Sequence, residues 1–153
     1  ALFWSDGRLF LLTKHRADSR TTLRRFPDLE GPPSGSSTAA SVFSLPPLGE
    51  FELGGDPERF GGKVTGADVS PDGAWLAVLT YHAIFLFPRP ERPEDWLRGT
   101  PKRIDLEQLV TQQDEAIAWD GEALIFTNEG GDLFRIANPH DPACRRFPTP
   151  GCR

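Results

Sequence analysis

Six polar residues stand at matching places along the chain and carry the functional groups of a ligand-binding or acid–base site: Lys14, Asp68, Tyr81, Glu115, Asn128 and Glu129. Lys14, Tyr81 and Asn128 each follow a threonine that ends a hydrophobic run. Carboxylates such as those of Asp68 and Glu115 can hold a hard cation or act as general acid and base. We expect the six on one face of the fold as ligand-binding residues, with Asp68, Glu115 and Glu129 as the ligands of any metal.

The charges within this set predict its chemistry. Lys14 is the one cation among the six, and an ammonium within about 6 Å of a carboxylate favours the ionised carboxylate. We expect Lys14 to neutralise Asp68 and Glu115, which leaves a polar site without a reactive acid. The competing interpretation is structural: hydrogen bonds between neighbouring units of the fold would be formed by Asp68 together with Thr13, Thr80 and Thr127.

The sequence does not match the known catalytic motifs that it partly resembles. Residues 61–65 (Gly-Gly-Lys-Val-Thr) place Val64 where a phosphate-binding loop needs serine or threonine. The chain has no Gly-x-Ser-x-Gly elbow of a serine hydrolase. Its histidines form no His-x-x-x-His pair, and we interpret them as surface residues: His15, His82 and His140. No catalytic residue is therefore assigned, and a binding protein is favoured over an enzyme.

A threefold repeat positions these residues. Each unit has a hydrophobic run, an Asp-Gly pair and a second hydrophobic run ending in threonine, and the pairs begin at Asp6, Asp72 and Asp120. Asp-Gly between hydrophobic runs predicts a tight hairpin, because glycine accepts the positive φ that such turns need. Two more strand-like segments follow in each unit, the last of them at residues 144–147. Four short strands at a period of about 40–50 residues are typical of a β-propeller blade.

The sequence thus predicts an all-β fold of three four-stranded antiparallel meanders, at about residues 1–54, 64–106 and 115–149, within one partial propeller domain. Residues 31–41, rich in glycine, proline and serine, predict a flexible insertion. Closed propellers have roughly four to eight blades. We therefore expect either half of a six-bladed propeller, completed by the remaining blades, or a ring closed by a second copy of the chain, and we favour the first.

Composition excludes some partners. The chain has 153 residues and a formal net charge of −5, so it lacks the basic surface of a nucleic-acid-binding domain. Its longest apolar run, residues 74–87, is shorter than the roughly 20 residues of a membrane span. Trp4 and Trp119 occupy the same repeat position, where we expect core packing between blades.

Several motifs resemble those of known propellers. Residues 70–73 (Ser-Pro-Asp-Gly) resemble a signature that is frequent in WD40-like and TolB-like blades. With residues 11–14, 64–69, 79–81, 114–118 and 127–131, they are similar to a group of uncharacterised bacterial propeller proteins, many of them exported. The chain is also distantly similar to the esterase-like propellers related to phytases. The resemblance implies an extracellular or periplasmic location.

Two functions of different class follow. The first is a non-enzymatic propeller domain of an exported protein that binds a small ligand or partner at its channel face without a cofactor. The alternative, implied by the phytase-like resemblance, is a metal-assisted hydrolase with Ca²⁺ held by Asp68, Glu115 and Glu129.

The two cysteines, Cys144 and Cys152, are eight positions apart. In an exported protein they could close a disulfide loop that ties down the last strand, whereas in a cytosolic protein they would be free thiols. Their spacing leaves both states open.

Overall fold

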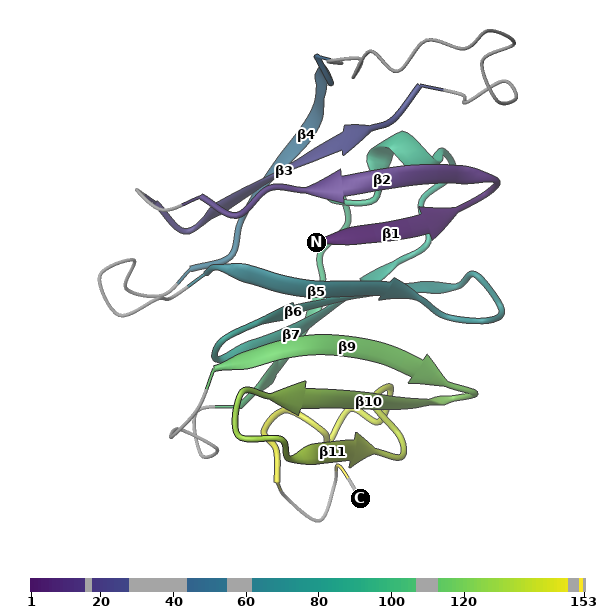
Figure 1. Ribbon diagram of the computed structural model, residues 1–153. Helices are drawn as coiled ribbons and strands as arrows, with labels where there is room; N and C mark the ends of the chain where they lie inside the picture. Colours follow the sequence, from purple (N-terminus) through teal and green to yellow (C-terminus); the bar gives the residue numbers. More distant parts are fainter. Residues whose placement is uncertain (16–17, 28–43, 55–61, 107–112, 149–151, 153) are drawn as a thin grey trace, which may run out of the picture.

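Three antiparallel sheets make up the computed structural model, which describes residues 1–15, 18–27, 44–54, 62–106, 113–148 and 152 (Figure 1). The first two sheets have four strands each, in the orders β1-β2-β3-β4 and β5-β6-β7-β8, and the third has three, in the order β11-β10-β9. The insertion expected at residues 31–41 lies outside the described residues.

The strands are short, as the turn-rich sequence predicts. In chain order they are β1 (Leu2–Ser5), β2 (Arg8–Leu12), β3 (Arg20–Arg25), β4 (Pro47–Glu52), β5 (Val64–Val69), β6 (Trp75–Thr80), β7 (Ala83–Pro88), β8 (Lys102–Asp105), β9 (Asp114–Asp120), β10 (Ala123–Asn128) and β11 (Leu133–Ile136). Between β7 and β8 lies one 3-10 turn, η2 (Pro93–Asp95). Among the described residues no helix has the length and apolar character needed to cross a membrane.

Hairpins form at all three Asp-Gly pairs as predicted, although in the third Asp120 ends β9 and the turn residues are Gly121 and Glu122. Asp6 and Gly7 connect β1 to β2 with φ values of 49° and 74°, and a two-residue turn of this kind requires positive φ at both positions. Gly73 and Gly121 have φ values of 71° and 63° in the other two hairpins. Glycine is suited to these positions because it lacks the Cβ that makes positive φ costly.

The first strands of the three sheets lie side by side, with β5 between β1 and β9 (Figure 1). The backbones of β5 and β9 approach so closely that a Cβ on Gly66 would be 3.0 Å from the Ile117 nitrogen. A side chain larger than hydrogen would therefore push the two sheets apart. Meander sheets joined through their innermost strands are the architecture of propeller blades. The predicted all-β class of propeller blades is confirmed.

Two hydrophobic cores separate the sheets. One lies between the first and second sheets and includes Phe10, Leu12 and Phe87, and the other lies between the second and third sheets and includes Leu79 and Phe126. The strands β6 and β7 supply buried residues to both cores, because successive side chains point to opposite faces of a sheet. The second sheet is thus covered on both faces, as its nearly continuous apolar sequence predicts.

The third sheet differs from the prediction, since residues 144–147 do not form its fourth strand. They run along β8 of the second sheet, where the Asp105 amide donates to the Arg145 carbonyl and the Phe147 amide donates to the Asp105 carbonyl, both at 2.8 Å. Proline lacks the N–H that a strand ladder needs, and Pro142 and Pro148 flank this segment, so the chain between them is too short for a long strand. The segment therefore covers the core between the second and third sheets, without extending the third sheet.

One face of β1 is open. Leu2 and Trp4 are 52% and 61% exposed, whereas Phe3 and Ser5, which point the other way, are buried. The expectation of core packing between blades was therefore wrong for Trp4. Its repeat equivalent, Trp119, packs against the second sheet, but in the described part of the chain no sheet precedes β1.

Candidate functional site

Five of the six predicted site residues lie at one end of the strands, opposite to the Asp-Gly hairpins. Lys14 and Tyr81 follow β2 and β6, Glu115 stands at the start of β9, Asn128 ends β10 and Glu129 follows it. We call this the turn face. Asp68 is elsewhere, because it lies near the other end of β5, beside the hairpin that leads to β6.

Lys14 and Tyr81 contact each other across the first and second sheets. The Lys14 ammonium donates a hydrogen bond to the Tyr81 hydroxyl at 2.6 Å and lies 4.6 Å from the centroid of its ring. We expected Lys14 to neutralise Asp68 and Glu115, but the partner of its ammonium in the described structure is the Tyr81 hydroxyl. Lys14 therefore holds two sheets together through Tyr81.

Asp68 links the second and third sheets. One of its carboxylate oxygens accepts the Trp119 amide at 2.9 Å, and its carbonyl accepts the Trp119 indole N–H at 3.2 Å. Trp119 stands four residues after Glu115, which places Asp68 ~13 Å away along β9 at about 3.3 Å per residue. The structure thus does not bring Asp68 and Glu115 together as a carboxylate pair.

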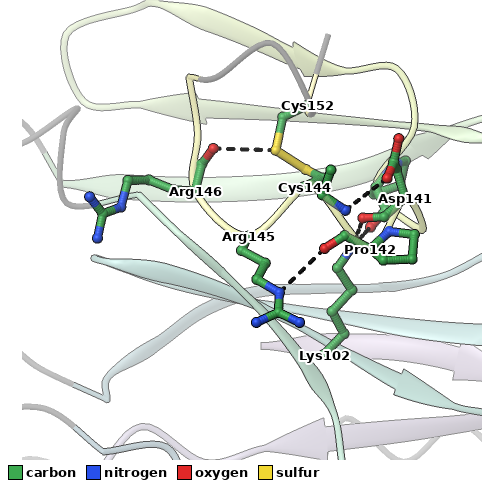
Figure 2. The surroundings of a disulfide bond; sticks show 9 residues. Lys102, Asp141, Pro142, Cys144, Arg145, Arg146 and Cys152 are labelled. Carbon is green, nitrogen blue, oxygen red and sulfur yellow. Dashed lines mark hydrogen bonds between the residues drawn. A yellow bond between two sulfur atoms is a disulfide. The ribbon is translucent and has the colours of Figure 1, made fainter.

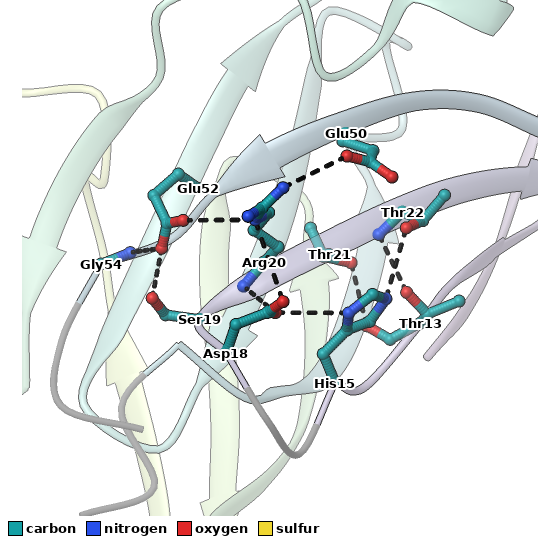
Figure 3. A network of polar contacts seen from close by, with 10 residues as sticks. All are labelled: Thr13, His15, Asp18, Ser19, Arg20, Thr21, Thr22, Glu50, Glu52 and Gly54. Atoms are coloured by element: carbon teal, nitrogen blue, oxygen red, sulfur yellow. Dashed lines mark hydrogen bonds and ion pairs between the residues drawn. The ribbon is translucent and has the colours of Figure 1, made fainter. Parts of the chain in front are cut away.

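The threonines of the repeat stabilise turns within single sheets. The Thr13 hydroxyl accepts the Thr22 amide at 2.9 Å, in a network that also includes His15 and Asp18 (Figure 3). The Thr80 hydroxyl donates to the Ala83 carbonyl at 3.0 Å inside the β6–β7 hairpin. We expected Asp68 and the repeat threonines to form hydrogen bonds between units. Asp68 does so through Trp119, whereas Thr13 and Thr80 form hydrogen bonds within their own sheets.

The remaining predicted residues cluster at the start of β9. Asn128 is the register partner of Asp114, and its side chain bonds to Asp132 at 3.0 Å. The Glu129 amide donates to the Gln113 carbonyl at 2.9 Å. Across the residues that the structure describes, no three His, Cys, Asp or Glu side chains gather as a group that could hold a metal ion.

Asp114 is a buried acid that the sequence did not single out. It is 2% exposed at the start of β9, and burial raises the pKa of its carboxyl from 3.8 to about 6. Charge on His82 opposes this rise in the pKa, and the neighbouring Glu115 adds to it. Asp114 is thus a buried acid on the turn face with a pKa far above that of an ordinary aspartate.

A pocket of about 330 Å³ lies at the opposite end, beside the hairpins of the second and third sheets. It is lined by Ser70, Pro71, Asp72, Trp75, Trp119, Gly121, Glu122 and His140. We call it the hairpin pocket. Its volume is near the lower end for small-ligand sites, and its combination of aromatic walls with a few polar groups is typical of such sites.

His140 contacts both indoles of the hairpin pocket. Its ring centroid is 4.8 Å from that of Trp75 and 5.4 Å from that of Trp119, to which it is nearly parallel at 13°. Burial lowers the pKa of His140 and the nearby Lys102 charge lowers it further, whereas Asp72 and Glu122 oppose the change, so the net effect favours the neutral ring. Its Nδ1 is buried and has no hydrogen-bond partner in the described structure.

Lys102 and the disulfide hold the segment that follows His140 (Figure 2). The Lys102 ammonium donates to the carbonyls of Pro139 and Asp141. The structure joins Cys144 to Cys152, and both are fully buried. Lys102 of β8 and the disulfide of the C-terminal segment thus determine where His140, the third aromatic wall of the pocket, lies.

Sequence reasoning missed the hairpin pocket. His140 was interpreted as a surface histidine because the three histidines are far apart in the sequence and form no His-x-x-x-His pair. The repeat does place residues 70–72 and residues 119–122 at equivalent hairpins, which was a usable signal for these two walls. Nothing in the repeat indicates that the segment after β11 folds back to add His140.

No protein-family model matches the chain. No curated protein matches it either. Among solved structures it is similar to the β-propeller domain of Cps50 (Swd1) from Myceliophteria thermophila, with 15% sequence identity and a TM-score of 0.47. The match covers 88% of this chain and 38% of that one, so this chain spans less than two fifths of the length of the matched structure.

Replacing Asp68 with alanine should lower the free energy of unfolding by about 1–3 kcal/mol, because the Trp119 amide loses its acceptor in a partly buried place. Urea unfolding measures the change. The matched control is Asp120→Ala, whose exposed carboxylate is 3.5 Å from Arg135 and should be worth less than about 0.5 kcal/mol. Equal losses in the two variants would contradict a specific Asp68–Trp119 link.

Asp114 predicts a pH dependence of stability. Its pKa is higher in the folded chain, so between pH 3.8 and about 6 the folded chain holds a proton that the unfolded chain releases. The free energy of unfolding contributed by this group therefore falls as the pH rises through that range. Asp114→Asn should flatten the decline and gain on the order of 1–3 kcal/mol over the natural chain at pH 7.5. Parallel curves of unfolding free energy against pH would show that Asp114 does not titrate as described.

Proposed function

We propose that this chain is part of a β-propeller that serves as a binding scaffold, with a small ligand in the hairpin pocket. The observation that carries the proposal is the pocket itself, which has two indoles and an imidazole as walls and two carboxylates on its lining. Rigid strands position these groups, and turns at the strand ends leave them accessible, which is the usual arrangement of a binding site on a β scaffold.

The turn face is a weaker candidate for the ligand site. The Lys14 ammonium and the Asn128 amide are engaged with other side chains of the chain. Asp68 has hydrogen bonds to Trp119 and to the Val69 amide, and it lies at the other end of its strand. In the described structure the side chains of Glu115 and Glu129 form no hydrogen bond. The lysine and amide groups of the turn face are thus engaged within the chain, and the aromatic walls of the hairpin pocket have no counterpart among the six predicted residues apart from Tyr81.

In this proposal the protein is exported to an extracellular or periplasmic compartment. The Cys144–Cys152 disulfide supports this location, because disulfides persist mainly in oxidising compartments.

The propeller is completed by further blades, and the open face of β1 is where one of them docks. Trp119 shows what such a contact contains, since its amide and indole N–H groups both bond to Asp68 of the preceding sheet. Trp4 occupies the equivalent repeat position and is 61% exposed. A blade before β1 would cover Trp4 and Leu2 in the same way. We propose that the complete ring has six blades, of which this chain supplies half.

Ligand binding in the hairpin pocket can be tested with phenol as a neutral aromatic probe. We expect a saturable shift of the Trp119 indole N–H resonance in proton–nitrogen correlation spectra, because that N–H is fixed on the Asp68 carbonyl beside the pocket. Trp75→Leu should weaken phenol binding about fivefold or more through loss of one aromatic wall. Leu133→Ala, an exposed change at the other end of the third sheet, is the matched control. Unchanged pocket resonances at all phenol concentrations would overturn the proposed site.

The hydrolase alternative has its own readout in the same spectra. Calcium held by Glu115 and Glu129 would give saturable shifts on the turn face, which lies at the opposite end of the strands from the hairpin pocket, and Glu115→Gln would remove them. Such shifts would favour the hydrolase, whereas the scaffold proposal expects none.

Blade docking on β1 predicts self-association of this chain. In a solution of the chain alone, a second copy is the only source of another blade, so sedimentation velocity should show association that increases with concentration. Trp4→Lys should abolish the association because it places a charge in the centre of the docking face. Glu91→Lys, which changes charge at an exposed loop, should leave it intact. A chain that stays monomeric at every concentration would contradict docking at this face.

A further inference from the structure

We infer that the hairpin pocket binds an organic cation, either a quaternary ammonium or a protonated amine with a compact apolar body. This inference rests on the proposed function, since it names the ligand class of the same pocket. Three features of the pocket carry it: the aromatic walls, the sign of the charges on its lining, and the positions of the nearby cationic side chains.

Two indoles and an imidazole line the hairpin pocket. The rings of tryptophan attract cations electrostatically within about 6 Å of the ring, more strongly than those of tyrosine or phenylalanine do. Trp75 and Trp119 both line the hairpin pocket and both contact the His140 ring, so the two indoles lie around one small volume. Burial lowers the pKa of His140 and so favours its neutral ring, which does not repel a cation in the pocket.

The charges on the lining are negative. Asp72 and Glu122 are the two ionisable groups beside His140, and no lysine or arginine lines the pocket. The Ser70 hydroxyl donates to Asp72 and lowers the pKa of its carboxyl, so Asp72 is ionised at neutral pH. In the described structure Glu122 has no hydrogen bond or ion pair, which leaves its carboxylate available to a ligand. An anionic ligand would meet two like charges here, whereas a cation is attracted by both.

Two cationic side chains in this part of the molecule are held by other groups. The Lys102 ammonium is bound by the carbonyls of Pro139 and Asp141 behind His140. Arg89, next to the β5–β6 hairpin, donates to the Gly73 carbonyl at 3.1 Å and pairs with Asp6 of the first sheet. Neither side chain is therefore placed to neutralise Asp72 and Glu122 from within the pocket.

Choline and its uncharged isostere 3,3-dimethyl-1-butanol test the inference, because the two differ chiefly in the charge of one atom. Titrations of each against the whole chain, followed by the Trp119 indole resonance, should give about tenfold tighter binding for choline. Glu122→Gln should weaken choline binding about three- to tenfold and leave binding of the alcohol unchanged. Glu91→Gln, at an exposed loop outside the pocket, is the matched control.

The outcomes separate this inference from the proposed function. Equal affinity for choline and the alcohol, or binding of the alcohol alone, would overturn the cation inference while the pocket remained a ligand site. Loss of alcohol binding together with choline binding in Glu122→Gln would also overturn it, because the carboxylate would then act through the shape of the pocket. Absence of binding by choline, the alcohol and phenol would overturn both proposals.

Discussion

The close contact between β5 and β9 is the constraint on which the other features depend. Gly66 lets the two backbones meet, and Asp68, two residues further on, bonds to the amide and indole N–H groups of Trp119. These contacts fix the offset of the third sheet along the strand direction relative to the second sheet. Trp119 in turn stands opposite Trp75 across His140, so the geometry of the hairpin pocket follows from the register of two neighbouring inner strands.

The C-terminal segment has a second, independent effect on the same place. It leaves the third sheet and runs along β8, where Lys102 holds two of its carbonyls and the Cys144–Cys152 disulfide lies in the core. Because of this crossing, His140 belongs to the third repeat by sequence but is positioned by the second sheet. The pocket therefore has walls from three separate segments of the chain.

The sequence was informative where its signals were local. The Asp-Gly turns at Asp6 and Asp72 and the apolar runs of β6 and β7 are short-range features, and the blades could be predicted from them. The candidate site was predicted poorly, because repeat equivalence shows which sheet position a residue occupies but not what it meets. Asp68 and Glu115 occupy different ends of adjacent strands, a relation that depends on the offset of whole sheets along the strand direction. The place of His140 depends on hydrogen bonds between the C-terminal segment and β8 and on a lysine from another unit, and neither effect has a periodic pattern.

The burial of the second sheet on both faces has a consequence for how the molecule moves. Its strands β6 and β7 contribute side chains to both hydrophobic cores, whereas β4 and β11 are outermost strands of their sheets. Local opening costs least where few buried apolar contacts are lost. Fluctuations should therefore begin at β4 and β11 and reach the middle sheet last, since opening that sheet would disrupt both cores together. The two walls of the hairpin pocket then differ in kind: Trp75 stands on the sheet that opens last, and Trp119 on a sheet that can separate from it.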